Sequence, residues 1–88
     1  MFEAPITRLT LYGERISGNC LKTLWTAELC NLDHDWIDVD ILKGETRTPE
    51  FLKLNPVGQI PLARWPDGRS LTQSNAIIWW MAQETASP

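Results

Sequence analysis

The hydrophobic spacing changes twice within the first forty residues, and these changes constrain the fold more than any other feature. Residues 6–12 alternate apolar and polar side chains, which is typical of a β-strand. After a loop, residues 19–29 carry apolar side chains at helical spacing, and residues 36–40 return to a strand pattern. Such a unit favours two parallel strands joined by a right-handed crossover.

The second half of the chain adds a short helix, a hairpin and a last helix. Thr48 is a good helix cap and Pro49 fits the first helical position, so a short helix is expected there. The turn Pro66-Asp67-Gly68 joins two strands, which makes that pair antiparallel. Ser74 is expected to cap the last helix. The bounds expected are 60–64 and 69–72 for the strands, and 74 to about 84 for the helix.

The predicted order of elements is therefore β-α-β-α-β-β-α. A mixed four-stranded sheet with three helices satisfies both the parallel and the antiparallel pair. This is an α/β fold of one domain over residues 1–88, with its core at 6–84. A chain of this length buries only about 60–65% of its unfolded surface, so modest stability is expected.

The charge pattern argues against nucleic acid as a partner. The net charge is −3 and no block of like charges occurs, whereas a duplex-binding surface needs clustered Lys and Arg. The apolar stretch at 76–82 is far shorter than the roughly 18–20 residues of a membrane span. The first residues carry neither a basic region nor an apolar signal core. We therefore expect a cytoplasmic protein with no membrane and no nucleic acid partner.

The cysteines and the single histidine limit the redox and metal chemistry. Cys20 and Cys30 fall on one predicted helix, and the rise of an α-helix separates them by about 15 Å. A disulfide needs Cα atoms within about 7 Å, so both thiols are expected to stay free, as in a reducing compartment. His34 gives too few ligands for a zinc site of the Cys/His type, so no metal is expected.

Ser17, Asn19 and Cys20 form the first candidate site, at the start of the first helix. Backbone N–H groups at a helix start attract an anion, and a hydroxyl there can hold a thiolate. The alternative, a plain helix cap by Ser17 or Asn19, is the commoner outcome for such residues. Ser17 and Cys20 have the spacing of a Cys-x-x-Cys redox pair whose first thiol is replaced by a hydroxyl. Cys20 is therefore either a small core residue or a reactive thiol.

Two further segments could face that helix start. Ile60-Pro61 opens the third strand, and a cis bond there would turn the backbone of Ile60 outward toward an extended peptide. An ordinary trans proline is the alternative. Gln73 and Ser74 begin the last helix, where Ser74 either caps the helix or binds a ligand carboxylate.

The last helix is apolar on both faces. Trp79 and Trp80 are expected to pack rather than to hold a cofactor, because Ile77, Ile78 and Met81 share their helix. We therefore expect one face to be covered by something outside these 88 residues, and the isolated domain to be poorly soluble or to self-associate.

Together these segments resemble the N-terminal domain of cytosolic glutathione transferases. The resemblance covers about residues 7–84, and the start of the first helix looks most like that of bacterial members. It implies a thioredoxin-like fold, with glutathione bound as a substrate. The matching segments are Leu11-Tyr12-Gly13, Ser17-Gly18-Asn19-Cys20-Leu21-Lys22, Thr48-Pro49-Glu50-Phe51-Leu52, Asn55-Pro56-Val57-Gly58-Gln59-Ile60-Pro61, Asp67-Gly68 and Leu71-Thr72-Gln73-Ser74-Asn75-Ala76-Ile77-Ile78.

The resemblance also implies roles for the residues near the first helix and the third strand. Ser17 would donate a hydrogen bond to the glutathione sulfur and stabilise its thiolate, and Asn19 could assist or substitute. Ile60, before a cis Pro61, would pair its backbone with the cysteinyl part of the tripeptide. Protein groups would form no covalent bond to the substrates.

The two ends of the tripeptide are assigned in the same way. Gln73 and Ser74 would hold the γ-glutamyl end, and Gln59 would reach toward the glycine carboxylate. Many relatives have Lys or Arg where Gln59 stands, and a His that some use beside that carboxylate corresponds to Thr46, with Arg47 as a stand-in.

The family also carries an all-helical C-terminal domain that builds the electrophile pocket and much of the dimer interface, and residues 1–88 do not include it. The expected partners are glutathione, a small electrophile, and either a second copy of the chain or that helical domain. The isolated domain is expected to be inactive or weakly active. Two alternatives stay open: a non-catalytic binding or assembly module, and a glutathione-linked thiol–disulfide oxidoreductase that uses an exposed Cys20.

Overall fold

The strands and helices follow the predicted order, with one short 3₁₀ helix added. The computed structural model describes residues 8–86, so the start of the predicted first strand at residues 6 and 7 lies outside the described residues. The elements are β1 (Leu9–Gly13), α1 (Gly18–Leu29), β2 (His34–Asp38), the 3₁₀ helix η1 (Glu45–Arg47), α2 (Pro49–Leu54), β3 (Leu62–Arg64), β4 (Ser70–Thr72) and α3 (Ser74–Ala86).

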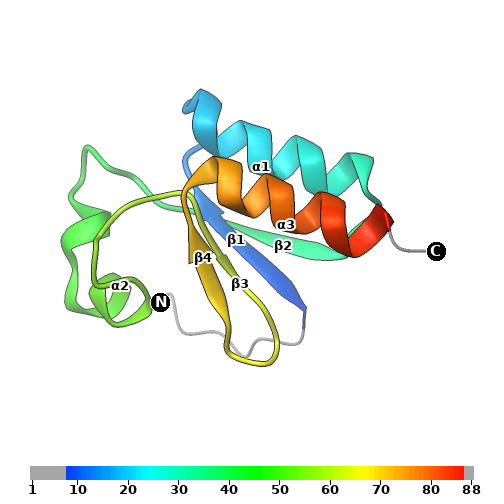
Figure 1. The fold of residues 1–88 in the computed structure, drawn as a ribbon. Coiled ribbons are helices and arrows are strands. Elements are labelled where there is room, and N and C mark those ends of the chain that lie inside the picture. Colours follow the sequence, from blue (N-terminus) through cyan, green and yellow to red (C-terminus); the bar gives the residue numbers. More distant parts are fainter. Residues whose placement is uncertain (1–7, 87–88) are drawn as a thin grey trace.

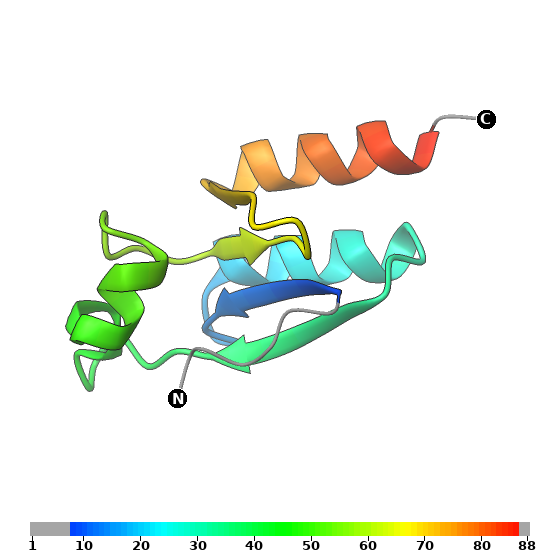
Figure 2. The ribbon, with the colours of Figure 1, turned by 90° about the horizontal axis from the view of Figure 1, so that it is seen from below.

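The sheet is mixed and four-stranded, as the element order predicts. Its strand order is β2-β1-β3-β4, with β1 and β2 parallel and the other two pairs antiparallel. Helices α1 and α3 lie side by side on one face of the sheet, and both begin at the same end of it (Figure 1). Helix α2 lies beyond that end of the sheet rather than on its face, and the view from below shows the same placement (Figure 2).

Alternate residues of the central strand β1 divide between two cores. Leu9 and Leu11 pack with Ala27 of α1 and with Ile77 and Met81 of α3, between the helices and the sheet. Tyr12 points the other way, because successive side chains of a strand face opposite sides. It packs with Val39, Phe51 and Leu62 in a second cluster beside α2, and all four of these side chains are almost fully buried.

The ends of α1 and α2 follow from local hydrogen bonding. The hydroxyl of Thr48 accepts from the Phe51 N–H at 3.2 Å, and Pro49 is the first helical residue of α2, as predicted. At the end of α1, Asn31 adopts a left-handed φ of 56°, and the Leu32 N–H donates to Ala27 O at 2.9 Å, which is a Schellman ending. No helix in the described part of the chain is long and apolar enough to cross a membrane.

Four predicted boundaries are corrected. Strand β2 begins at His34 rather than at Trp36, and it ends before Asp40, whose carboxylate accepts the N–H groups of the following turn. Strand β3 begins at Leu62 rather than at Ile60, after the proline. Cys30 is the residue that caps the end of α1 rather than a residue within that helix, and both thiols are free.

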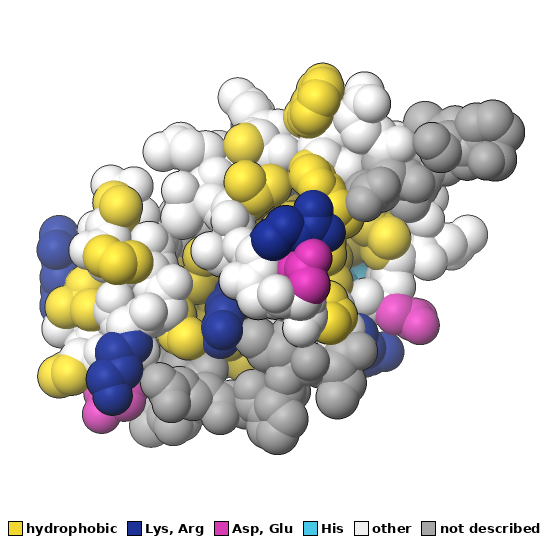
Figure 3. Space-filling view, turned by 60° about the horizontal axis from the view of Figure 1, so that its bottom comes forward, with side chains coloured by type: hydrophobic (Ala, Val, Ile, Leu, Met, Phe, Trp, Pro, Cys, Tyr) yellow, Lys and Arg dark blue, Asp and Glu magenta, His cyan; other side chains and the backbone are white. Residues whose placement is uncertain are grey.

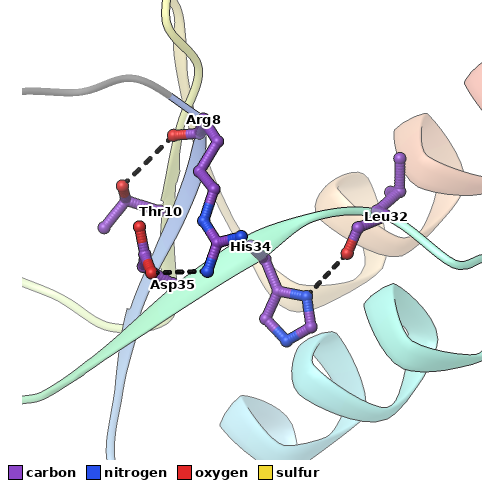
Figure 4. Close-up of polar contacts among 5 residues, drawn as sticks. All are labelled: Arg8, Thr10, Leu32, His34 and Asp35. Carbon is purple, nitrogen blue, oxygen red and sulfur yellow. Dashed lines mark hydrogen bonds and ion pairs between the residues drawn. The ribbon is translucent and has the colours of Figure 1, made fainter.

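An ion pair joins the starts of β1 and β2 (Figure 4), and Figure 1 shows that this end of the sheet lies away from α2. The Arg8 guanidinium donates to the Asp35 carboxylate at 2.7 Å. This hydrogen bond, together with the positive charge of Arg8, lowers the pKa of Asp35. The His34 ring points toward Leu32 in Figure 4, with its Nδ1 2.7 Å from Leu32 O.

Candidate functional site

The sheet register gathers the three predicted site segments at one end of the molecule. Tyr12 pairs with Leu62, and Leu62 pairs with Thr72, so these three residues form one row across β1, β3 and β4. The chain continues beyond this row into three segments that are far apart in sequence. These are the loop that leads to Ser17, the Ile60–Pro61 bond and the Gln73–Ser74 helix start.

Ser17 occupies the cap position of α1 but leaves its hydroxyl unused. Its backbone is extended, and its carbonyl accepts the first helical hydrogen bond from the Leu21 N–H at 2.9 Å. The side chain makes no capping hydrogen bond. Ser17 therefore occupies the position of a helix cap, but its side chain does not cap the helix. Its hydroxyl remains available at a helix start that favours an anion.

Asn19 and Cys20 differ sharply in exposure. Asn19 is exposed in the first turn of α1, whereas Cys20 is only 1% exposed and faces the sheet. A methyl group on Gly13 of β1 would lie 2.9 Å from Cys20 Cβ and 3.1 Å from its Sγ, so the thiol packs tightly against the end of β1. Burial of this kind is typical of a small core residue.

The Ile60–Pro61 peptide bond is cis, which confirms the expectation from the resemblance and not the ordinary trans alternative. Within residues 8–86, no hydrogen bond engages the backbone N–H or C=O of Ile60. Buried Asn55 holds the preceding loop, since its side-chain amide donates to Gln59 O at 2.7 Å. The backbone groups of Ile60 are therefore presented by a fixed loop and are free to pair with an extended peptide.

The start of α3 is shifted by one residue from the prediction. The carbonyl of Gln73 accepts from the Ile77 N–H at 3.1 Å, so Gln73 occupies the cap position and Ser74 is the first helical residue. Gln73 has a left-handed φ of 75°, a strained conformation for a residue other than glycine. Ser74 therefore presents its N–H and its hydroxyl at the first turn of α3 instead of capping the helix.

A hollow of about 430 Å³ adjoins Ile60, between the η1 segment and the loop before β3. Thr46 and Arg47 line one side of it, and Gln59 and Ile60 line the other. Gly58, with a φ of 70°, lets the Arg47 guanidinium approach closely, because a methyl group there would lie 3.3 Å from an Arg47 nitrogen. The hollow thus combines a cation, an amide and backbone groups, which suits a carboxylate.

The whole-chain comparisons agree with this geometry. Residues 16–84 match the family described as the glutathione S-transferase N-terminal domain. The chain belongs to this family. The combination of three α-helices with a mixed four-stranded sheet is the thioredoxin-like fold of such transferase domains.

Three similar proteins show how far the likeness extends. A possible glutathione S-transferase from Rhodopseudomonas palustris is 42% identical with a TM-score of 0.83, over 93% of this chain and 41% of its own. A glutathione transferase homolog from Sulfitobacter, solved with bound glutathione, is 26% identical with a TM-score of 0.85, over 92% of this chain and 38% of its own. Elongation factor 1-gamma from Prunus avium is 40% identical over 76 residues, which are 85% of this chain and 18% of that protein. This transferase domain therefore spans about two fifths or less of each of these proteins.

Several apolar side chains of the transferase domain remain at its surface, and Figure 3 shows hydrophobic groups exposed between charged ones. On α3, Ile77 and Met81 are fully buried, while Trp79 is 65% exposed. On the neighbouring α1, Trp25 and Leu29 are also exposed. The last helix is thus apolar on its outer side as well, in agreement with the sequence pattern.

Asn55, Gly58 and Glu14 have structural parts in the site that the sequence did not single out. Asn55 and Gly58 shape the loop before the cis bond. The signal for both was present in the Asn-Pro-x-Gly run, where glycine permits the left-handed turn. Glu14 contacts the β2–η1 loop through its side chain, and no spacing rule marks such a contact between distant loops.

Proposed function

We propose that this domain binds glutathione and holds it as a thiolate that attacks a small electrophile, as the glutathione-binding half of a transferase. The observation that carries the proposal is the meeting of three groups at one end of the sheet. They are the unused Ser17 hydroxyl, the unpaired backbone of Ile60 before a cis proline, and the open start of α3. The Sulfitobacter homolog with bound glutathione supports the choice of ligand.

Ser17 would act on the sulfur. Its hydroxyl donates a hydrogen bond to the thiolate, and the start of α1 adds a favourable positive dipole end. Both effects favour the charged form and lower the pKa of the bound thiol. Asn19 is exposed two residues further along the chain, in the first turn of α1, where its amide could assist.

The cysteinyl part of the tripeptide would lie along Ile60. Its N–H and C=O are free in the described structure, and an extended peptide can pair with both in the manner of an added strand. This recognition uses the backbone and therefore depends on the chain path around Pro61 rather than on the side chain of Ile60.

The two charged ends would be bound on either side of that strand. The γ-glutamyl carboxylate would accept from the N–H and hydroxyl of Ser74, with Gln73 beside it, at the start of α3. The glycine carboxylate would enter the hollow beside Gln59 and Arg47. Arg47 supplies the positive charge that Gln59 lacks.

The reaction needs no covalent protein intermediate. The thiol proton passes to water, the thiolate sulfur forms a bond to the electrophilic carbon, and the electron pair leaves with the displaced group or remains on the electrophile. The domain lowers the barrier by keeping the sulfur ionised at neutral pH. The electrophile, a homodimeric partner and a helical second domain are parts of the same proposal, as is a cytoplasmic location, which the free thiols support.

A titration with reduced glutathione tests the proposal. Amide NMR shifts should cluster at Ser17 to Cys20, at Ile60 and at Gln73 to Asn75. A hydrogen bond to a charged group contributes about 1.5–3 kcal/mol. Ser17→Ala should therefore raise the pKa of the bound thiol by about 1–2 units, at about 1.4 kcal/mol per unit.

The thiol pKa is read from the ultraviolet absorbance of the thiolate in the complex. Ser70→Ala, an exposed serine at the other end of β4, is the matched control and should leave it unchanged. Absence of any amide shift at millimolar glutathione would refute glutathione binding. An unchanged thiol pKa in Ser17→Ala would refute the role of Ser17 alone.

A non-catalytic assembly module is the second candidate, and the match to elongation factor 1-gamma favours it. The same titration separates the two, because a pure assembly module shows no response to glutathione. A thiol–disulfide oxidoreductase using Cys20 is disfavoured, since a reactive thiol must be accessible and Cys20 is 1% exposed.

A further inference from the structure

We propose that Glu14 is a positioning residue that fixes the two ends of the glutathione site relative to each other. The inference rests on the proposed function, because it concerns the spacing between the thiolate end at Ser17 and the carboxylate end at Arg47. Glu14 itself lies outside both ends, in the loop between β1 and α1.

Glu14 contacts both sides of the site with different atoms. Its backbone carbonyl accepts from the Ser17 N–H at 3.0 Å, which closes the turn that presents the Ser17 hydroxyl. Its carboxylate Oε2 accepts from the Ile41 N–H at 3.2 Å, across 27 residues of sequence. One residue thus links the turn before α1 to the loop after β2.

The loop after β2 transmits this contact to the carboxylate end. The Gly44 N–H donates to Ile41 O at 2.9 Å, and the Arg47 N–H donates to Gly44 O at 3.0 Å. Two successive turns therefore connect the residue that Glu14 holds to the cation of the hollow. Ile41 also lines that hollow directly.

Two other carboxylates keep this loop in one shape. Asp40 Oδ1 accepts from the N–H groups of Leu42 and Lys43, at 2.9 and 3.3 Å. Glu45 Oε1 accepts from the Asp40 N–H at 2.7 Å. These bonds lie within the loop and preserve its shape. The backbone hydrogen bond from the Val39 N–H to Gly13 O, at 2.8 Å, ties the start of the loop to the end of β1, and the Glu14 carboxylate adds a contact further along the loop. The Glu14 carboxylate is the side-chain group in residues 8–86 that hydrogen-bonds the turn before α1 to this loop.

A positioning role depends on the reach of the side chain, whereas an electrostatic role depends on its charge. Glu14→Asp keeps the charge but is one methylene shorter, so its carboxylate cannot reach the Ile41 N–H without moving the loop. Glu14→Gln loses the charge but keeps an oxygen acceptor at the same reach. The pair therefore separates the two roles.

The test compares the affinities of glutathione and of γ-glutamylcysteine, which lacks the glycine. The wild-type protein should bind glutathione more tightly than γ-glutamylcysteine, because only glutathione places a glycine carboxylate in the hollow beside Arg47. Glu14→Asp should reduce this preference by about threefold to tenfold, the value of one net hydrogen bond. Glu14→Gln should keep the preference for glutathione near the wild-type ratio. Calorimetric titration gives both constants, and a melting curve shows that each variant is folded.

The outcomes are distinct. If the wild-type protein binds neither peptide, the proposed function fails, and the inference about Glu14, which rests on it, fails with it. If glutathione binds and Glu14→Asp keeps the full glycine preference, the positioning role is wrong. A loss in Glu14→Gln together with retention in Glu14→Asp overturns the inference in favour of a role for the charge.

Discussion

Gly13→Ala tests the close packing on which the start of α1 depends. The added methyl would lie 2.8 Å from Trp36 Cη2 and 2.9 Å from Cys20 Cβ, well inside the roughly 3.5–4.0 Å of ordinary carbon contacts. Neither neighbour gives way easily. The Trp36 ring is held by its N–H, which donates to Asp38 at 2.6 Å, and Cys20 Cβ is fixed to the first turn of α1.

The expected loss follows from these distances. Overpacking of a core costs about 1–3 kcal/mol. The alanine also reduces the freedom of the unfolded chain, which returns about 0.4–1 kcal/mol. The net destabilisation is at most about 2.6 kcal/mol, and its centre, about 1.3 kcal/mol, lowers Tm by about 5–10 °C in a domain of this size. Because Cys20 moves with α1, glutathione affinity should fall as well.

Gly18→Ala is the matched control. Gly18 is the first helical residue of α1, and nothing lies within 4 Å of a methyl group placed there. Alanine should therefore stabilise the protein by about 0.4–1 kcal/mol. Thermal unfolding followed by circular dichroism measures both variants. A Gly13→Ala protein that melts at or above the wild-type temperature would refute the packing argument.

Two further predictions concern charge and the exposed apolar face. The hydrogen bond from Arg8 lowers the pKa of Asp35, so its stabilisation is present at neutral pH and is lost as pH falls through the lowered pKa. Asp35→Asn should thus unfold slightly more easily at pH 7 in urea, with a difference that vanishes in acid or high salt; a constant difference across pH would contradict this. Trp79→Glu, at an exposed site, should reduce self-association in analytical ultracentrifugation and shift stability by no more than about 0.5 kcal/mol. Equal association of both proteins would argue against this face as the contact.

The element order and the start of α2 could be predicted because local chemistry determines them. Thr48 and Pro49 begin α2 as expected, since a cap and a proline act on the backbone within a few residues. The end of β2 was misplaced because Asp40 reads as part of an alternating pattern. Its carboxylate instead accepts two N–H groups of the next turn, and such competition between side chain and backbone is invisible in hydrophobic spacing.

The structure brings the candidate segments to one end of the sheet, but their local conformations were less predictable. Ser74 was expected at the cap because serine is a preferred capping residue, whereas a left-handed Gln73 holds that place. Nothing intrinsic to glutamine favours that backbone, so the surrounding fold must impose it. The cis bond before Pro61 likewise followed from the resemblance and not from the residues, because trans is the common state of X-Pro bonds. The burial of the Cys20 side chain depends on its close contact with Gly13, which lies on β1, so the sequence around Cys20 alone does not reveal it.

The unpaired backbone of Ile60 has a consequence for how such a domain diverges. A peptide N–H and C=O are the same in every residue except proline, so replacing Ile60 with valine or leucine leaves the recognising atoms unaltered. Selection on ligand binding at this position therefore acts on the course of the chain, while the side chain is free to drift with its packing neighbours. A related sequence can therefore change most of the side chains around this position and still bind the same peptide through the same backbone N–H and C=O.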